Sequence, residues 1–167
     1  MTSSGAIERL VGHCTAMESL RGRIAQFALS ELRVQVFGET GTGKEQVARA
    51  LHELSARANR RFVPVNAAGF SDELFTAELF GHARGAFTGA IRQRKGRIER
   101  SHGGTLFLDE IGDISPATQV LLLRFVQDHY FERVGGERAI EANVRVLAAT
   151  NQDLQEAVEA GHFRDDL

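Results

Sequence analysis

A glycine-rich segment at residues 38–45 constrains the fold of this chain more than any other feature. It fits the pattern G-x-x-x-x-G-K and lies between a short apolar run at 34–37 and a stretch at 44–54 with apolar residues at helical spacing. Glycines let successive backbone N–H groups turn toward phosphate oxygens, and the start of a helix adds partial positive charge. The segment therefore predicts a strand, a phosphate-binding loop and a helix, in that order. The alternative is a glycine-rich turn that holds no ligand.

All residues of this phosphate loop are candidate nucleotide contacts: Gly38, Glu39, Thr40, Gly41, Thr42, Gly43, Lys44 and Glu45. Among them, Lys44 has the reach to contact the β- and γ-phosphates. Glu45 departs from the general pattern, because most such loops have a Ser or Thr there to hold Mg²⁺. The pattern alone does not explain this departure.

Two carboxylates, Asp109 and Glu110, stand at the end of an apolar run. The run predicts a strand at Thr105–Asp109 that is buried on both faces, because it is continuously apolar. In a parallel sheet the carboxyl ends of the strands meet at one edge, so both acids are expected beside the phosphate loop. We expect Asp109 to hold Mg²⁺, directly or through water, and Glu110 to polarise the attacking water. A pair of solvated acids is the alternative.

Helix and strand signals alternate along the rest of the chain. The predicted strands are Val34–Phe37, Phe62–Val65, Thr105–Asp109 and Val144–Ala149. The helix start and stop signals are the capping box of Thr15 and Glu18, the pair Ser115 and Pro116, and the caps Asp153, Glu156 and Gly161. This alternation predicts an α/β fold with a parallel, doubly wound sheet flanked by helices. We expect a lead-in at residues 1–10 and one domain at 11–167.

Composition excludes several other classes of protein. With 43% hydrophobic residues the chain can bury a core of its own, and its net charge of -2 does not indicate nucleic acid as the main partner. The first ten residues show no apolar run after a basic segment, so we expect no secretory signal, and no stretch of the sequence approaches a membrane span. Cys14 is the only cysteine, which fits a reducing cytoplasm, and the six histidines show no metal-ligand spacing. We expect a cytoplasmic protein without a membrane partner.

Several segments together resemble the AAA+ ATPase domain of bacterial enhancer-binding proteins, the activators that depend on sigma-54. In that family Glu is usual after the loop lysine, which accounts for Glu45. The matching segments are residues 38–45, Glu78–His82, Gly85–Ala90, Gly103–Asp113, Phe131–Gly135, Ala149–Asn151 and Phe163–Leu167. The resemblance covers nearly all of the chain from Val11, and the hexapeptide GAFTGA at 85–90 is its most specific part.

The resemblance implies further site residues. Asn66 is similar to a switch that holds the catalytic Glu away from its substrate, and Thr150 with Asn151 to a sensor of the γ-phosphate. Arg164 is similar to an arginine finger that acts on a neighbouring subunit, and Val11 with Gly12 to part of the adenine pocket. Without the resemblance, Asn66 would be interpreted as a turn residue and Arg164 as a solvated helix end.

The GAFTGA segment is expected to contact sigma-54. Phe87 lies among small residues with too little periodicity for a core helix, which is typical of a mobile presenting loop. The resemblance implies that the whole segment grips the sigma factor: Gly85, Ala86, Phe87, Thr88, Gly89 and Ala90. The alternative is that Phe87 anchors the loop. The resemblance also makes Arg133–Glu141 a second loop that faces the substrate.

A basic stretch follows the GAFTGA segment: Arg92, Arg94, Lys95 and Arg97. We interpret it mainly as a solvated face, and contact with promoter DNA is the secondary interpretation.

The function implied by the resemblance is ATP hydrolysis that remodels sigma-54 RNA polymerase. The expected cofactors are ATP and Mg²⁺, and the expected assembly is a ring, by resemblance a hexamer. DNA would be bound only through another domain. A fifth strand beside 34–37, a second arginine finger and a helical lid are expected beyond Leu167, so the AAA+ fold is expected to be truncated at its C-terminus with the lid missing. Another AAA+ remodeller, or a nucleotide-binding or oligomerisation module without turnover, is the alternative.

Overall fold

Four parallel strands form the central sheet of the computed structural model, which describes residue 5 and residues 9–167. Residues 1–4 and 6–8 of the predicted lead-in lie outside the described residues. The strands in spatial order are β1 (Val34–Phe37), β8 (Arg145–Thr150), β5 (Thr105–Asp109) and β2 (Phe62–Asn66). Every pairing between them is parallel. The predicted parallel sheet is confirmed, with β2 one residue longer and β8 shifted by one residue.

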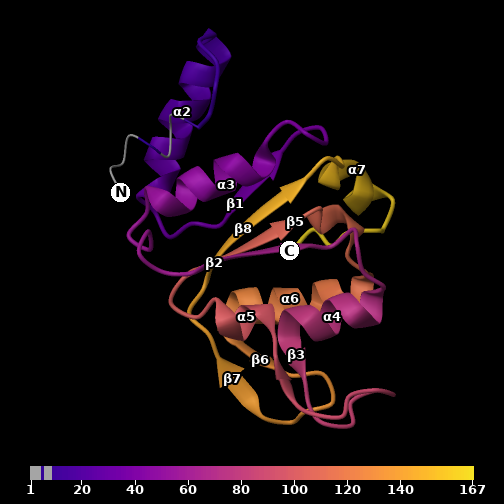
Figure 1. The fold of residues 1–167 in the computed structure, drawn as a ribbon. Coiled ribbons are helices and arrows are strands. Elements are labelled where there is room, and N and C mark those ends of the chain that lie inside the picture. Colours follow the sequence, from indigo (N-terminus) through magenta and orange to yellow (C-terminus); the bar gives the residue numbers. More distant parts are fainter. Residues whose placement is uncertain (1–4, 6–8) are drawn as a thin grey trace.

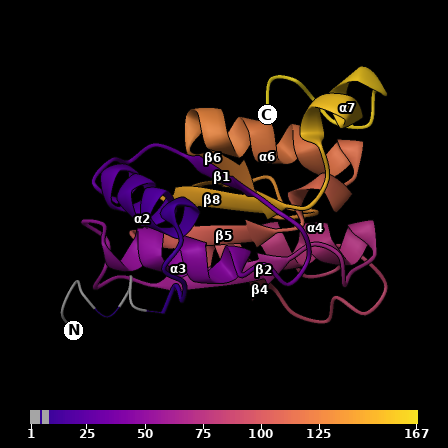
Figure 2. The same cartoon turned by 90° about the horizontal axis from the view of Figure 1, so that it is seen from above.

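Helices cover both faces of this sheet, as Figures 1 and 2 show. On one face lie α2 (Thr15–Ala28) and α3 (Lys44–Glu53), and their apolar residues pack on Phe107 and Leu147 of the sheet. On the other face lie α4 (Asp72–Phe80), α5 (Arg97–Arg100), α6 (Pro116–Asp128) and α7 (Leu154–Glu159). The first four residues of β5 are buried because helices cover the strand on both sides. The predicted three-layer α/β fold is therefore confirmed.

Two of the predicted helix caps form and one does not. Ser115 Oγ accepts a hydrogen bond from Thr118 N at 3.3 Å, with Pro116 at the first position of α6. Asp153 Oδ1 accepts from Gln155 N and Glu156 N at the start of α7. The predicted capping box at Thr15 is wrong. Thr15 is already helical, and Cys14, which makes no side-chain cap bond, occupies the N-cap position.

Two short hairpins lie together at the end of the domain far from α2 (Figure 1). One pairs β3 (Gly81–His82) with β4 (Arg94–Lys95), and the other pairs β6 (Tyr130–Glu132) with β7 (Ala139–Glu141). Val134 joins them, because its N–H donates to Gly81 O and its carbonyl accepts from Ala83 N, both at 3.0 Å. The sequence did not predict these strands, α4 or α5. The four strands span only two or three residues each, which is too short to show a periodicity.

Arg145 is buried, with 2% of its surface exposed, and its guanidinium forms hydrogen bonds with the C-terminal end of α2. Its guanidinium donates to Phe27 O at 2.7 Å, Ala28 O at 3.2 Å and Leu32 O at 3.3 Å. Phe27 and Ala28 end α2, and Leu32 lies in the segment before β1, so the guanidinium joins the end of the helix to the segment that follows it. Burial lowers the pKa of Arg145, so the cation depends on these acceptors.

We expect Arg145→Met to lower the free energy of unfolding by about 3 kcal/mol, because it removes the hydrogen bonds of a buried guanidinium and takes this donor from the carbonyl of the buried Ala28. Urea unfolding followed by circular dichroism measures this loss. Arg23→Met, which changes an exposed arginine of α2, is the control and should have little effect. Equal stability of the Arg145 variant and the parent would contradict the capping role.

No helix among the described residues is both long enough and apolar enough to cross a bilayer.

Candidate nucleotide-binding site

The phosphate loop lies at the carboxyl edge of the sheet, between β1 and α3. Gly38 N donates to Thr150 O at 3.2 Å, which ties the start of the loop to the end of β8. Gly41 and Gly43 have φ values of 82° and 88°, a region that strongly favours glycine. Thr42 Oγ1 donates to Glu39 O at 2.7 Å, and this exposed hydrogen bond links two residues of the loop. The predicted order of strand, loop and helix is confirmed.

Lys44 begins α3, and its side chain lies inside the loop. Only 7% of Lys44 is exposed. Its Nζ donates to Gly38 O at 3.0 Å and Glu39 O at 3.4 Å, and it lies 3.3 Å from Glu110 Oε1. The ammonium group thus connects the loop with the acidic end of β5, although 66 residues separate the two partners.

The two carboxylates at the end of β5 have different surroundings. Burial raises the pKa of Asp109, and the neighbouring charge of Glu110 raises it further. Asp109 Oδ1 accepts from Glu110 N at 3.1 Å. Glu110 adopts the left-handed conformation, with φ 53° and ψ 51°, which is uncommon outside glycine. The turn directs its carboxylate back toward the phosphate loop, where Lys44 lies.

Asn151 completes a polar group around Glu110. Its backbone N–H donates to Glu110 Oε2 at 3.2 Å, and its Nδ2 donates to Thr40 Oγ1 at 3.2 Å. The residue therefore contacts the acidic strand end and the phosphate loop at once. Thr150, just before it, is fully buried, and its hydroxyl accepts from Gln152 N at 3.0 Å. The structure brings both predicted sensor residues to the loop.

Asn66 ends β2 directly beside Asp109 in the strand register. Its Nδ2 donates to Asp109 Oδ2 at 3.3 Å, and its Oδ1 accepts from Ala68 N at 2.8 Å. The amide thus contacts Asp109, whereas Glu110 is held by Lys44 and Asn151. A switch that acts by holding Glu110 would need a different arrangement of these side chains.

Glu45 points along α3 and away from the loop interior. It forms an ion pair with Arg49, with Nη2 2.7 Å from Oε1, and the Arg49 guanidinium lies 4.9 Å from the centroid of the Phe62 ring. The side chain that departs from the common loop pattern therefore has a structural contact of its own.

Three other predicted site residues, Arg164, Val11 and Gly12, lie outside this polar group. Arg164 pairs with Asp166 through two bonds, Nε to Oδ1 at 2.8 Å and Nη2 to Oδ2 at 2.6 Å. This partner raises the pKa of Arg164. Val11 is 85% exposed, and Gly12 O accepts from Arg21 at 2.7 Å. Within the described part of the chain, none of the three forms a hydrogen bond with the loop or with Glu110.

The sequence did not single out Gln119, which holds the segment that carries Arg164. It is 1% exposed. Its Oε1 accepts from Arg164 N at 2.9 Å, and its Nε2 donates to Ile114 O at 3.0 Å and His162 O at 2.9 Å. A glutamine on an amphipathic helix gives no local signal of such burial.

The GAFTGA segment forms a tight loop at the tip of the β3–β4 hairpin. Gly85 N donates to Ala90 O at 2.8 Å, and Ala90 N donates to Phe87 O at 3.0 Å. Phe87 is 40% exposed, and its ring meets that of His82 edge-on at a centroid distance of 5.0 Å. The side chain is therefore partly anchored and partly presented to solvent, so features of both predicted alternatives are present.

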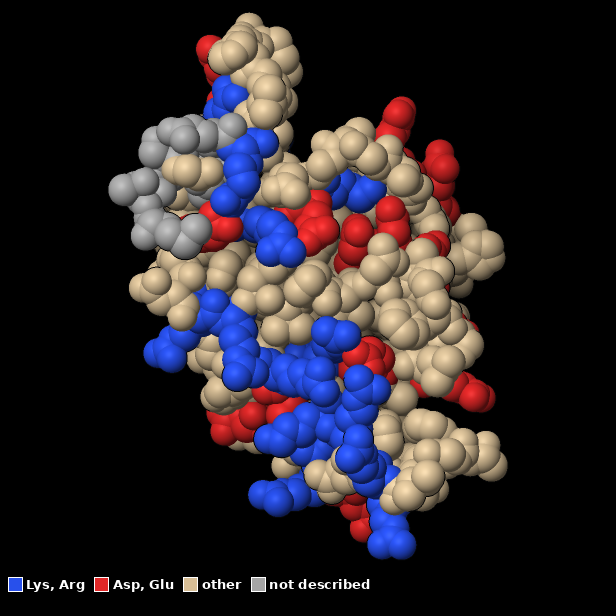
Figure 3. Space-filling model, viewed as in Figure 1, with Lys and Arg blue, Asp and Glu red and all other residues tan. Residues whose placement is uncertain are grey.

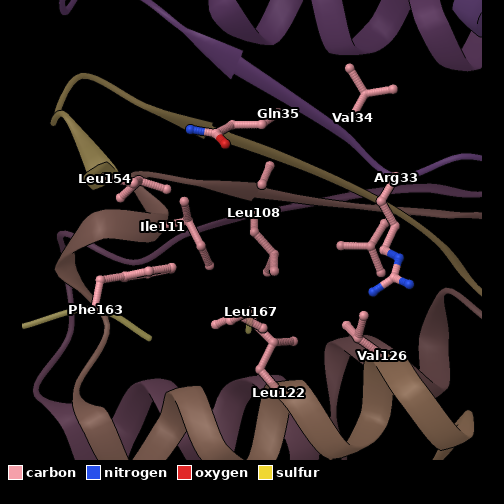
Figure 4. Close-up of a pocket in the computed structure, with 12 residues that line it drawn as sticks. Arg33, Val34, Gln35, Leu108, Ile111, Leu122, Val126, Leu154, Phe163 and Leu167 are labelled. Carbon is pink, nitrogen blue, oxygen red and sulfur yellow. The ribbon is translucent and has the colours of Figure 1, made fainter. Parts of the chain in front are cut away.

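An apolar cavity of about 200 Å³ lies away from these residues, between β1, β8, α6 and α7 (Figure 4). Leu108, Leu122, Val126 and Phe163 are among the side chains that line it. None of the predicted site residues does, so the candidate site is the polar carboxyl edge of the sheet and not this cavity.

The parallel sheet with a glycine-rich loop at its carboxyl edge defines a P-loop NTPase fold. The model of the Sigma-54 interaction domain matches residues 10–167, and the chain belongs to that family. It is 53% identical over 158 residues to the Nif-specific regulatory protein of Azotobacter vinelandii, covering 95% of this chain and 30% of that protein. It is 54% identical over 150 residues to the sigma54-dependent transcriptional regulator SfnR of Pseudomonas fluorescens, covering 90% of this chain and 41% of that one.

Solved structures agree with this assignment. The crystal structure of NtrX from Brucella abortus in complex with ATP superposes with a TM-score of 0.86 and 41% identity, covering 94% of this chain and 34% of that chain. The chain thus spans less than half the length of each of these relatives.

Proposed function

We propose that this domain binds Mg-ATP, hydrolyses it and uses the energy to remodel sigma-54 RNA polymerase so that the promoter opens. The observation that carries the proposal is the position of the Glu110 carboxylate. It lies between Lys44 Nζ and Asn151 N, next to a phosphate loop that Asn151 also contacts. A carboxylate so placed can accept a proton from water that attacks a phosphate held by the loop. The ATP complex of the relative NtrX supports the choice of nucleotide.

The residues present fit a magnesium ion together with the nucleotide. Asp109 and Glu110 are consecutive carboxylates, and burial together with the charge of Glu110 raises the pKa of Asp109. A divalent cation would relieve this repulsion. Within the described chain no group of three or more His, Cys, Asp or Glu could hold a metal, so phosphate oxygens would supply the remaining ligands. When bound through Asp109, directly or through water, Mg²⁺ would neutralise phosphate charge.

The other site residues take roles around this centre. Lys44 would exchange its contact with Glu110 for phosphate oxygens, which frees Glu110 to act as the base. Asn151 would sense the γ-phosphate through its contacts with the loop and with Glu110. Asn66 would act on the acidic strand end through Asp109. Val11 and Gly12 would border the adenine. The roles of Lys44, Asn151 and Asn66 rest on the contacts of the site and on the family, whereas the role of Val11 and Gly12 rests on the family alone.

Arg164 would act on the nucleotide of a neighbouring subunit in a ring, proposed to be a hexamer. In the single chain its guanidinium is held at the surface by Asp166 within its own segment. A neighbouring phosphate would have to replace that carboxylate. An arginine supplied across a subunit boundary stabilises the charge of the transferring phosphoryl group.

The loop at 85–90 would transmit to sigma-54 the conformational change that accompanies ATP hydrolysis. Val134 joins the β3–β4 hairpin to the β6–β7 hairpin, so a shift in one is passed to the other through backbone hydrogen bonds. The partner would be the sigma-54 RNA polymerase of the cytoplasm, which the names of relatives such as SfnR support. Recognition of a specific regulatory DNA sequence would be the task of another domain.

We expect Phe87→Ala and Thr88→Ala to abolish open-complex formation with sigma-54 RNA polymerase and to leave basal phosphate release largely unchanged. Both side chains lie on the exposed hairpin loop, away from the phosphate loop and Glu110. The assays are promoter opening and phosphate release on the same preparations of the full-length protein. Ile91→Ala, which removes a neighbouring side chain that is 85% exposed, is the control. Normal promoter opening by both loop variants would refute the assigned contact.

A further inference from the structure

A polar hollow lies at the amino-terminal ends of β2 and β5, the opposite edge of the sheet from the phosphate loop. It has a volume of about 550 Å³ and is lined by Asn59, Arg60, Arg61, Glu99, Arg100 and His102. The backbone fixes its two sides together, because Thr105 N donates to Arg61 O at 2.9 Å. Gly104 permits this approach, since a Cβ there would lie 2.2 Å from Arg61 O. The hollow is therefore part of the fold.

Positive charge in the hollow is not balanced. Among the described residues, Arg60, Arg61 and Arg100 take part in no ion pair. The single acid, Glu99, already binds Arg133 at 2.5 Å and Lys95 at 3.0 Å. Three arginines thus line one hollow without an acidic partner of their own, so an anion bound there would be attracted by their charges.

The positive charge continues beyond the hollow as a basic band. The band is formed by Arg60, Arg61, Arg94, Lys95, Arg97 and Arg100. Figure 3 shows Lys and Arg gathered over the region of α5 and β4. Arg94 and Arg97 both pair with Glu78, whose side chain is 13% exposed, while the Arg94 side chain is 54% exposed. Lys95 is 67% exposed on its side chain. The acids thus lie beneath the cations, and the outer surface is basic although the net charge of the chain is -2.

The shape and chemistry of this band fit a linear polyanion. No large exposed hydrophobic side chain of the described residues lies within 57–61 or 92–102. Protein interfaces have an apolar centre from which charged residues are depleted, whereas nucleic-acid interfaces are polar and strongly positive. All but one of the cations of the band are arginine, whose planar fork binds phosphate in a bidentate manner.

We propose that this basic band binds the phosphate backbone of a nucleic acid. One part of the band, Arg94 and Lys95, lies on β4, which follows the hairpin loop at 85–90 in the chain. A domain whose loop meets sigma-54 RNA polymerase would bring this surface to promoter DNA, and this part of the inference rests on the proposed function. Binding through the band does not require nucleotide, because the hollow lies at the opposite edge of the sheet from the phosphate loop.

The test measures fluorescence anisotropy of a labelled DNA duplex of unrelated sequence over a series of salt concentrations. The double variant Arg60→Ala/Arg61→Ala should bind about tenfold more weakly and reduce the slope of log affinity against log salt by about two, one for each arginine that no longer meets a phosphate. Arg60→Lys/Arg61→Lys should retain the slope, because the charges remain. Arg124→Ala, which removes an exposed arginine on α6 outside the band, should bind as the parent does.

Three results would overturn the proposal. The parent chain could fail to bind the duplex, or the double alanine variant could keep the parental slope. Alternatively, polyglutamate of matched charge could bind as tightly as DNA and lose affinity equally in the double variant, which would make the band a surface for acidic protein. Lys44→Ala should bind DNA normally, so loss of the ATPase function and loss of the basic band are measured separately.

Discussion

Glu110→Gln is expected to retain ATP binding and to lower steady-state phosphate release by about a hundredfold or more. The amide keeps the size of the side chain and can still accept a hydrogen bond from Asn151 N, but it cannot take a proton from water. It also removes the charge that faces Lys44 at 3.3 Å, which leaves the ammonium free for phosphate. ATP affinity should therefore be equal to that of the parent or higher.

The measurement compares calorimetric titration with phosphate release in the full-length protein. Glu159→Gln makes the same chemical change on the exposed face of α7 and should alter neither quantity. Parental turnover in the Glu110 variant would show that another group activates water. A loss of both ATP affinity and turnover would instead indicate a structural role for Glu110, whose backbone is in the left-handed conformation.

Lys44→Ala is expected to weaken ATP binding by about a hundredfold, because charge-assisted hydrogen bonds to phosphate are removed. The weakening has a second cause in this structure. Lys44 is the cation beside Glu110, and its charge also lowers the pKa of Asp109, which burial and Glu110 raise. Without the ammonium group, the negative phosphates would meet the carboxylates of Asp109 and Glu110 without the cation that faces them in this structure.

Titration of the Lys44 variant with ATP measures this effect. The chain has one other lysine, Lys95, whose side chain lies on the hairpin at the far end of the domain. Lys95→Ala removes an equal charge and should leave ATP affinity unchanged. Unaltered affinity in the Lys44 variant would remove the phosphate loop from the proposed site. A thermal melting curve of each variant separates a defect in binding from a defect in folding.

Local patterns were sufficient to predict the parallel sheet and the phosphate loop. The pattern G-x-x-x-x-G-K needs only neighbouring residues, and so does the apolar run of β5 that ends in Asp109 and Glu110. The caps at Ser115 and Asp153 also act within three residues. Such signals arise from backbone conformation and from burial of a strand, both of which a short window of sequence reflects. At Thr15 such a signal was wrong by one residue, because Cys14 occupies the N-cap position.

The contacts that define the site could not be predicted from local sequence and are seen only in the tertiary structure. Lys44 meets Glu110 across 66 residues, and Asn151 meets Glu110 across 41, because the sheet order brings the ends of β1, β8 and β5 together. Strand order and register depend on how both faces of the sheet pack. No local pattern encodes this packing.

Sequence patterns were thus enough to predict the fold and to place the glycine-rich loop and the acidic strand end at one edge of its sheet. The contact of Asn66 with Asp109, and the hollow that the arginines at 60–61 and 100 share, emerged from the folded chain. Local conformational preference acts over a few residues, whereas these contacts join segments about forty residues apart, and burial of the core sets their relative positions.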